Sequence, residues 1–156
     1  ANFIYVGAAA KDPVASLPEL QVPAGAAYDP ATLYFYGISQ GHILGGTYTA
    51  LAPEVERATL GVGGANFSLI AFRAQPFSAF LILIGSILED KLDQQKFGVM
   101  LQQSFDRVDP LTYAPRLRTN TFPNSPAERR ILLQIGLGDP AVPNLPAHLH
   151  ARALGL

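Results

Sequence analysis

The chain has 156 residues, of which 49% are hydrophobic and 15% are charged, and this composition is typical of one compact globular domain. A formal net charge of -1 gives no electrostatic reason to expect nucleic acid as a partner. The absence of cysteine excludes disulfides, thiolate metal sites and a cysteine nucleophile, and we expect neither a metal ion nor another cofactor.

The first part of the chain predicts two strands separated by a loop. Residues 2–6 form a short apolar run that suggests a strand. Residues 11–28 contain three prolines, so we expect a loop there with at most a short helix. Residues 32–36 are apolar without alternation, which favours a strand buried on both faces of a parallel sheet.

The remainder predicts alternating helices and strands. We expect a helix over residues 40–51, a strand over 57–62, a long helical insert at about 76–110, a strand over 130–135 and a helix over 143–154. This order predicts an α/β fold in which a small, mainly parallel sheet has flanking helices and a helical cap, all within one domain covering residues 1–156. The longest apolar stretch, residues 77–88, is too short to span a bilayer.

The sequence Gly37-Ile38-Ser39-Gln40-Gly41 lies between the predicted strand and the predicted helix. G-x-S-x-G in that context is typical of a nucleophile elbow, a strained turn that exposes a serine above the edge of a sheet. Ser39 would then be the nucleophile, and the backbone N–H of Gln40 would donate to the oxyanion. The alternative interpretation is that the Ser39 hydroxyl only caps the helix.

A second motif covers residues 136–143, where Asp139 follows a predicted strand and a Val-Pro pair comes three residues later. The two motifs in this order resemble the α/β-hydrolase family, whose triad runs Ser, Asp/Glu, His along the chain. The resemblance implies a serine carboxylesterase or lipase-like enzyme that hydrolyses small acyl esters, with Ser39 as nucleophile and Asp139 as acid. Alternatively, Asp139 is a turn residue bonded to nearby backbone amides.

The resemblance covers the chain from about residue 32 to its end. The family would show further strands and an oxyanion loop upstream, and downstream a strand and a loop that carries the catalytic histidine. We therefore expect a partial α/β-hydrolase fold, truncated at both ends. Many relatives have a glycine where His42 stands, which suggests that the close neighbour of this helix is absent or displaced.

The base that Ser39 needs is left open between His42, His148, His150 and a histidine outside this chain. His148 and His150 are two residues apart on a predicted helix, so they should point to different sides of it. Solvated or core-edge positions are the default expectation for all three. A solvated helix end is likewise expected for Asp106, Arg107 and Asp109.

A sheet of so few strands leaves an apolar edge unpaired, which predicts a homo-oligomer or a complementing chain segment. Residues 77–88 fit a lid or acyl tunnel, a buried cap helix or a dimer face. If no histidine reaches Ser39, the second hypothesis applies, in which the chain is a catalytically silent hydrolase fragment that acts as a structural or self-assembling module.

Overall fold

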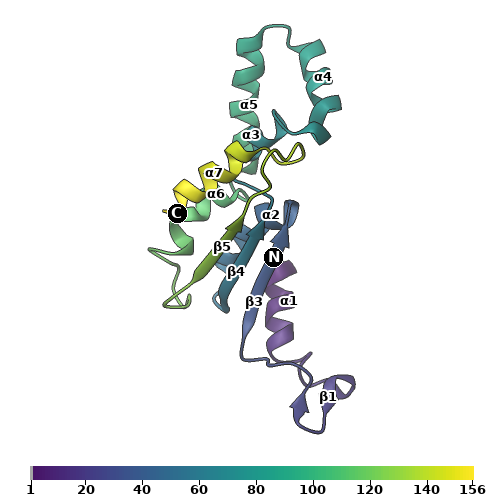
Figure 1. The fold of residues 1–156 in the computed structure, drawn as a ribbon, viewed down its shortest axis with the longest axis vertical. Coiled ribbons are helices and arrows are strands. Elements are labelled where there is room, and N and C mark those ends of the chain that lie inside the picture. The colour runs from purple at the N-terminus through teal and green to yellow at the C-terminus, as the bar shows by residue number, and fades with distance from the viewer. Residues whose placement is uncertain (1) are drawn as a thin grey trace.

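A computed structural model describes residues 2–156 and has a three-stranded parallel sheet at its centre (Figure 1). The strands are β3 (Leu33–Ile38), β4 (Val55–Gly61) and β5 (Arg130–Gln134), with β4 in the middle. Helix α2 (Gln40–Leu51) connects β3 to β4, and α6 (Pro110–Leu117) and α7 (Asn144–Ala153) lie beside it. The predicted α/β architecture with a small parallel sheet and flanking helices is confirmed.

The N-terminal prediction is wrong, because residues 2–6 belong to helix α1 (Asn2–Lys11) and not to a strand. A five-residue apolar run does not distinguish the two structures, and the alanines that follow it favour a helix. Beyond α1 the expected loop contains the short helix η1 (Pro18–Leu20) and a small antiparallel pair, β1 (Gln21–Val22) and β2 (Gly25–Ala26).

The central sheet buries one face and exposes the other. The buried face contributes Val55, Ala58 and Leu60, which pack with Tyr48 of α2 into a hydrophobic core. Strand β3 alternates instead of being buried on both sides as predicted: Tyr34, Tyr36 and Ile38 are between 52% and 64% exposed. The outward face of β3 is therefore an uncovered apolar surface.

The predicted helical insert consists of separate helices. After α3 (Phe67–Ala71) and η2 (Gln75–Phe77), helices α4 (Ser78–Ile87) and α5 (Lys91–Phe105) form a hairpin that projects beyond the sheet (Figure 1). No helix among residues 2–156 combines the length and the apolar character needed to cross a bilayer.

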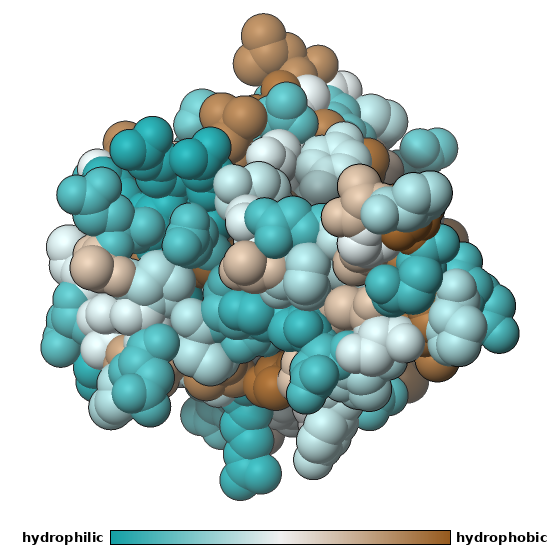
Figure 2. Space-filling view, turned by 90° about the horizontal axis from the view of Figure 1, so that it is seen from below, coloured by the Kyte–Doolittle hydropathy of each residue, from teal (hydrophilic) through white to brown (hydrophobic). Residues whose placement is uncertain are grey.

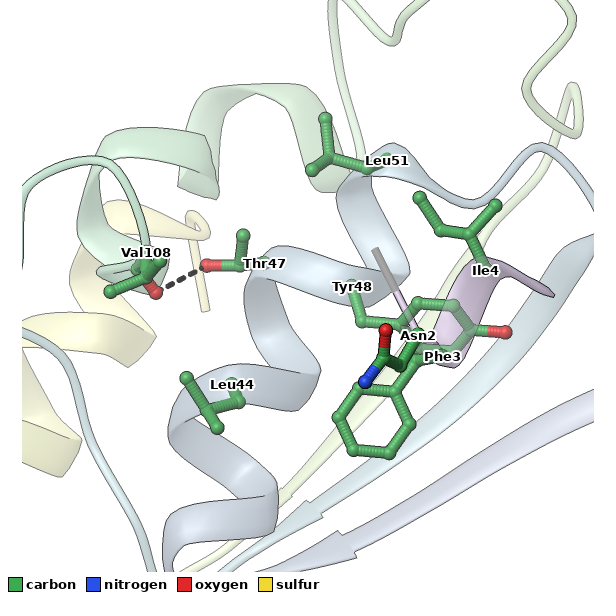
Figure 3. A pocket seen from close by; sticks show the side chains of 8 residues that line it. All are labelled: Asn2, Phe3, Ile4, Leu44, Thr47, Tyr48, Leu51 and Val108. Atoms are coloured by element: carbon green, nitrogen blue, oxygen red, sulfur yellow. Dashed lines mark hydrogen bonds between the residues drawn. The ribbon is translucent and has the colours of Figure 1, made fainter. Parts of the chain in front are cut away.

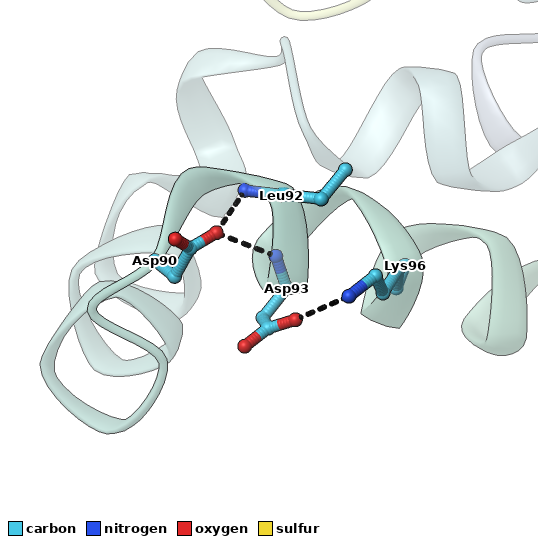
Figure 4. Close-up of polar contacts among 4 residues, drawn as sticks. All are labelled: Asp90, Leu92, Asp93 and Lys96. Carbon is cyan, nitrogen blue, oxygen red and sulfur yellow. Dashed lines mark hydrogen bonds and ion pairs between the residues drawn. The ribbon is translucent and has the colours of Figure 1, made fainter.

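The hairpin is held by a helix cap and by stacked aromatic rings. Asp90 ends the turn between its helices by accepting hydrogen bonds from the N–H groups of Leu92 and Asp93, and Lys96 pairs with Asp93 at 2.8 Å (Figure 4). The rings of Phe80 and Phe97 lie 6.4 Å apart across the two helices. Most apolar side chains of α4 are nevertheless exposed and only Ile84 is buried, so α4 is not the buried cap helix considered above.

The opposite end of the molecule has a different surface. Seen from that end, hydrophilic side chains predominate and apolar ones occur in scattered patches (Figure 2). Such scattered apolar residues are normal for a protein surface.

The turn from β3 into α2 brings two backbone segments into close contact. A Cβ atom added to Gly37 would collide with the backbone carbonyl of Gly41, so only glycine fits at position 37. Gly41 itself is open, because a Cβ atom added there would meet nothing within 4 Å. The two glycines of the motif therefore have different roles.

We predict opposite effects for the two glycine-to-alanine substitutions. Gly37→Ala should lower the free energy of unfolding by about 2–3 kcal/mol, because the turn has to open to admit the methyl group. Gly41→Ala should leave it unchanged or raise it by up to about 1 kcal/mol, since alanine is the better helix former. Urea unfolding of both variants measures the difference, and equal losses would contradict the close contact at Gly37.

Candidate active site

Ser39 has a strained backbone conformation at the turn from β3 into α2. Its φ of 56° and ψ of -116° lie outside the regions that residues other than glycine normally adopt. Its N–H donates to the carbonyl of Gly61 on β4 at 2.9 Å, which fixes the turn against the neighbouring strand. The residue is exposed, and its hydroxyl makes no capping hydrogen bond. The simple capping interpretation of Ser39 is therefore wrong.

The end of α2 beside Ser39 provides hydrogen-bond donors. Gln40 is the first residue of the helix, so its N–H has no partner within the helix. The aligned peptide dipoles of a helix also place partial positive charge at this end. A carbonyl oxygen that gains negative charge beside Ser39 would be stabilised here.

Asp139 lies in the loop after β5, so it and Ser39 both lie at the carboxyl end of the parallel strands. Its Oδ1 accepts hydrogen bonds from the N–H groups of Ala141 at 2.8 Å and Val142 at 3.1 Å. These are the bonds of the turn-residue interpretation, and because both go to Oδ1 they leave Oδ2 for another donor. The geometry therefore fits a structural turn, and it also fits a carboxylate held in place to receive a histidine.

One strand separates the two candidate residues. Ser39 follows β3 and Asp139 follows β5, with β4 between them. Two strand spacings amount to about 10 Å, which is too far for a direct hydrogen bond and suits an imidazole placed between them. Val62, at the end of β4, lies in this interval and has a φ of 40°, a genuine outlier for a β-branched residue. Backbone strain of this kind often occurs at functional sites.

The loop after β5 is hydrogen-bonded to the base of the helical hairpin. The N–H of Gln75 donates to the carbonyl of Pro140 at 2.9 Å. Val142 packs in one apolar cluster with Ile43 of α2, Ile70 of α3 and the partly buried Phe77. Helix α2, the loop after β5 and the start of the hairpin thus form one packed unit.

His42 and His150 are buried together, which neither a solvated nor a core-edge position would allow. Both are 0% exposed, and Nε2 of His42 lies 2.9 Å from Nδ1 of His150. Nδ1 of His42 accepts a hydrogen bond from the N–H of Gly63, so its Nε2 must carry the proton and donate to His150. Nε2 of His150 then carries a proton and has no hydrogen-bond partner among residues 2–156.

The neighbour of His42 is neither absent nor displaced. A Cβ atom added to Gly63 would collide with the side chain of His42, so the loop after β4 packs directly against the ring. The missing side chain at Gly63 on the facing loop leaves the space that the His42 ring occupies. His148 is exposed while His150 is buried, which confirms that the two point to different sides of α7.

Neither buried histidine is suited to serve Ser39 as its base. Burial, followed by the effect of the neighbouring His150, lowers the pKa of His42 to about 3. Burial lowers the pKa of His150 to about 4, against the opposing effect of the Asp109 carboxylate. Both nitrogens of His42 are already engaged. The structure places Ser39 and Asp139 at the carboxyl end of the parallel strands, and neither residue is hydrogen-bonded to His42 or His150.

Asp109 is buried and accepts several hydrogen bonds, so the prediction that it lies at a solvated helix end is wrong. It is 1% exposed and accepts hydrogen bonds from the N–H groups of Asn66, Phe67 and Leu111 and from the side chain of Gln102. It therefore joins α3, α5 and α6. The Asp-Pro pair predicts only the helix start, because the N–H groups of Asn66 and Phe67 come from residues more than 40 positions away.

No group of three His, Cys, Asp or Glu side chains within residues 2–156 is arranged to hold a metal ion. Comparisons of the chain with protein-family models, with curated proteins and with solved structures found no match.

The histidine pair predicts a steep loss of stability in acid. Both folded-state pKa values, about 3 and about 4, lie below the ordinary value of 6.5, so stability is fully present above pH 6.5 and falls as the pH decreases toward 4. Each histidine adds a slope of about 1.4 kcal/mol per pH unit within that window.

Replacing one member of the pair should reduce this slope by about that amount. Urea unfolding of His150→Gln between pH 7 and pH 4.5 measures it. His148→Gln, which changes an exposed histidine of the same helix, is the matched control and should retain the slope of the unchanged protein. Parallel pH profiles for all three proteins would contradict a neutral buried pair.

Proposed function

We propose that this chain is a carboxylic ester hydrolase that uses Ser39 as its nucleophile. The observation that supports this most is the conformation of Ser39, which is strained, exposed and free of any capping bond. A strained turn that leaves its hydroxyl unused has no evident structural benefit, whereas it presents the hydroxyl to an incoming ester. The likeness to the partial α/β-hydrolase fold with a helical cap belongs to the same proposal.

In the proposed reaction, Oγ of Ser39 attacks the ester carbonyl and its proton passes to a histidine. The oxyanion forms beside the N–H of Gln40 at the start of α2. The tetrahedral intermediate then expels the alcohol, which takes the proton from the histidine, and leaves an acyl-serine. Water activated by the same histidine hydrolyses the acyl-serine. Asp139 orients that histidine and stabilises its charged form.

The histidine in this mechanism is His148, which is exposed on α7, or one supplied by a complementing chain segment or a second copy of the chain. His42 and His150 are excluded from the role because their shared hydrogen bond and their burial keep them neutral and engaged. The uncovered face of β3, with Tyr34, Tyr36 and Ile38, supports association, because an exposed apolar surface of this kind favours a partner.

The same observations support a second candidate function. A chain that has an elbow without a base, together with an uncovered apolar sheet face, also fits a catalytically silent module that assembles through its sheet. The two functions differ in whether Ser39 reacts, so a single substitution separates them.

We predict that the purified protein hydrolyses a short-chain chromogenic ester and that Ser39→Ala lowers kcat/KM at least about 1000-fold. Ser86→Ala, which removes another exposed serine hydroxyl from a helix, is the matched control and should keep full activity. Asp139→Asn should lower kcat more than it raises KM. Equal rates for the unchanged protein and Ser39→Ala would refute the hydrolase and leave the silent module.

A base supplied by a second copy predicts that activity depends on protein concentration. The specific activity should rise as the protein is concentrated through the dissociation constant of the dimer and then level off. Sedimentation velocity over the same concentrations should show dimer formation at the same midpoint. Ester hydrolysis with a constant specific activity and a monomeric protein would place the base within one chain and contradict this origin of the histidine.

A further inference from the structure

An apolar groove begins at the elbow. Its first part has a volume of about 360 Å³, lies between β3 and α2, and is lined by Gly37, Ile38, Gln40 and Gly41 among others. Its second part, about 340 Å³, continues along α2 as far as Leu51 (Figure 3). Both parts are lined by Phe3 of α1 and Leu44 of α2, so they adjoin each other along α2, and we call them together the elbow groove.

The lining of the elbow groove suits a hydrocarbon chain. None of the residues that line it is charged. The hydroxyl of Thr47 already donates a hydrogen bond to the carbonyl of Val108 at 2.8 Å, so a ligand does not have to supply a polar partner for it (Figure 3). Gly41 leaves the floor open near the elbow, because nothing lies within 4 Å of where its Cβ atom would stand.

The length of the groove indicates the length of the chain that fits. From Gly41 to Leu51 the helix rises by about 15 Å at 1.5 Å per residue. An extended hydrocarbon advances about 1.25 Å per carbon for C–C bonds of about 1.5 Å, so about 12 carbons span this distance. At the elbow end, the N–H of Gln40 and the helix dipole favour an oxygen that carries negative charge.

We propose that the elbow groove binds the acyl chain of the substrate, which makes aliphatic esters with acyl groups of about 12 carbons the preferred substrate class. This inference rests on the proposed hydrolase function, since the groove takes its orientation from Ser39 and Gln40. The carbonyl of the ester lies at the elbow, and the chain runs along α2 toward Leu51, where the apolar walls remove it from water.

The test measures binding without catalysis. In the Ser39→Ala protein, calorimetric titration with dodecanoate should show binding, and adding Gly41→Leu should weaken it at least about 10-fold, because the new side chain fills the open floor. Gly85→Leu is the matched control: it makes the same change at a helical glycine of α4 that is also open, with only the side-chain nitrogen of Gln94 within 4 Å, at 3.9 Å. It should leave the affinity unchanged.

A second variant tests the direction of the chain and guards against misfolding of the first. Leu51→Asp places a carboxylate at the far end of the groove, so it should weaken dodecanoate at least about 5-fold and leave octanoate unaffected. Failure of the Ser39→Ala protein to bind dodecanoate, or equal effects of Gly41→Leu and Gly85→Leu, would overturn the inference. Ester hydrolysis by the unchanged protein together with either result would retain the hydrolase and reject the groove, whereas groove-dependent binding without hydrolysis would reject the hydrolase alone.

Discussion

The close approach of Gly37 to the carbonyl of Gly41 is the constraint on which the candidate site depends. It allows α2 to begin directly at the end of β3, with a single strained residue between them. A second contact of this kind, between Gly45 and the ring of Phe35, keeps the helix close to the strand one turn later. Because the helix starts at the sheet edge, Ser39 is exposed and the N–H of Gln40 lies beside it. The elbow groove lies along the same helix, and its floor is open at Gly41, where no atom lies within 4 Å of a Cβ position.

The buried polar residues below the turn, His42, His150 and Asp109, hold segments of the protein together. His42, His150 and Gly63 form a chain of hydrogen bonds that joins α2, α7 and the loop after β4. Asp109 satisfies backbone N–H groups at the starts of α3 and α6. Buried groups of this kind are costly when they are unpaired, and the two nitrogens of His42 and the carboxylate of Asp109 are paired. Ser39 differs from them, because its hydroxyl is exposed and uncommitted although its backbone is strained.

The sequence predicted best where strong local signals coincide. The G-x-S-x-G motif, flanked by an apolar run and a helical pattern, located α2 at its observed bounds, Gln40–Leu51, and β3 to within two residues. The predictions failed where contacts with distant segments determine the secondary structure or the burial of a residue. Residues 2–6 form a helix whose Ile4 packs on the core of Tyr48 and Val55, and no local period reveals this. The burial of Asp109 and of the histidine pair likewise depends on partners up to 108 positions away, which spacing along the chain does not show.

A segment added at the edge of the sheet could both cover its exposed apolar surface and supply the histidine that Ser39 lacks. Strands β3 and β5 each pair only with β4 within the described residues, so both edges have backbone groups ready for a further strand. Asp139 lies on the β5 side and its Oδ2 is not used by the turn, so a strand or loop added at that edge would arrive beside the oxygen that a catalytic histidine needs. The same addition would cover Leu132, which is 54% exposed on β5. Association and catalysis would then have a common origin, since the partner that covers apolar surface would also bring the base within reach of Ser39.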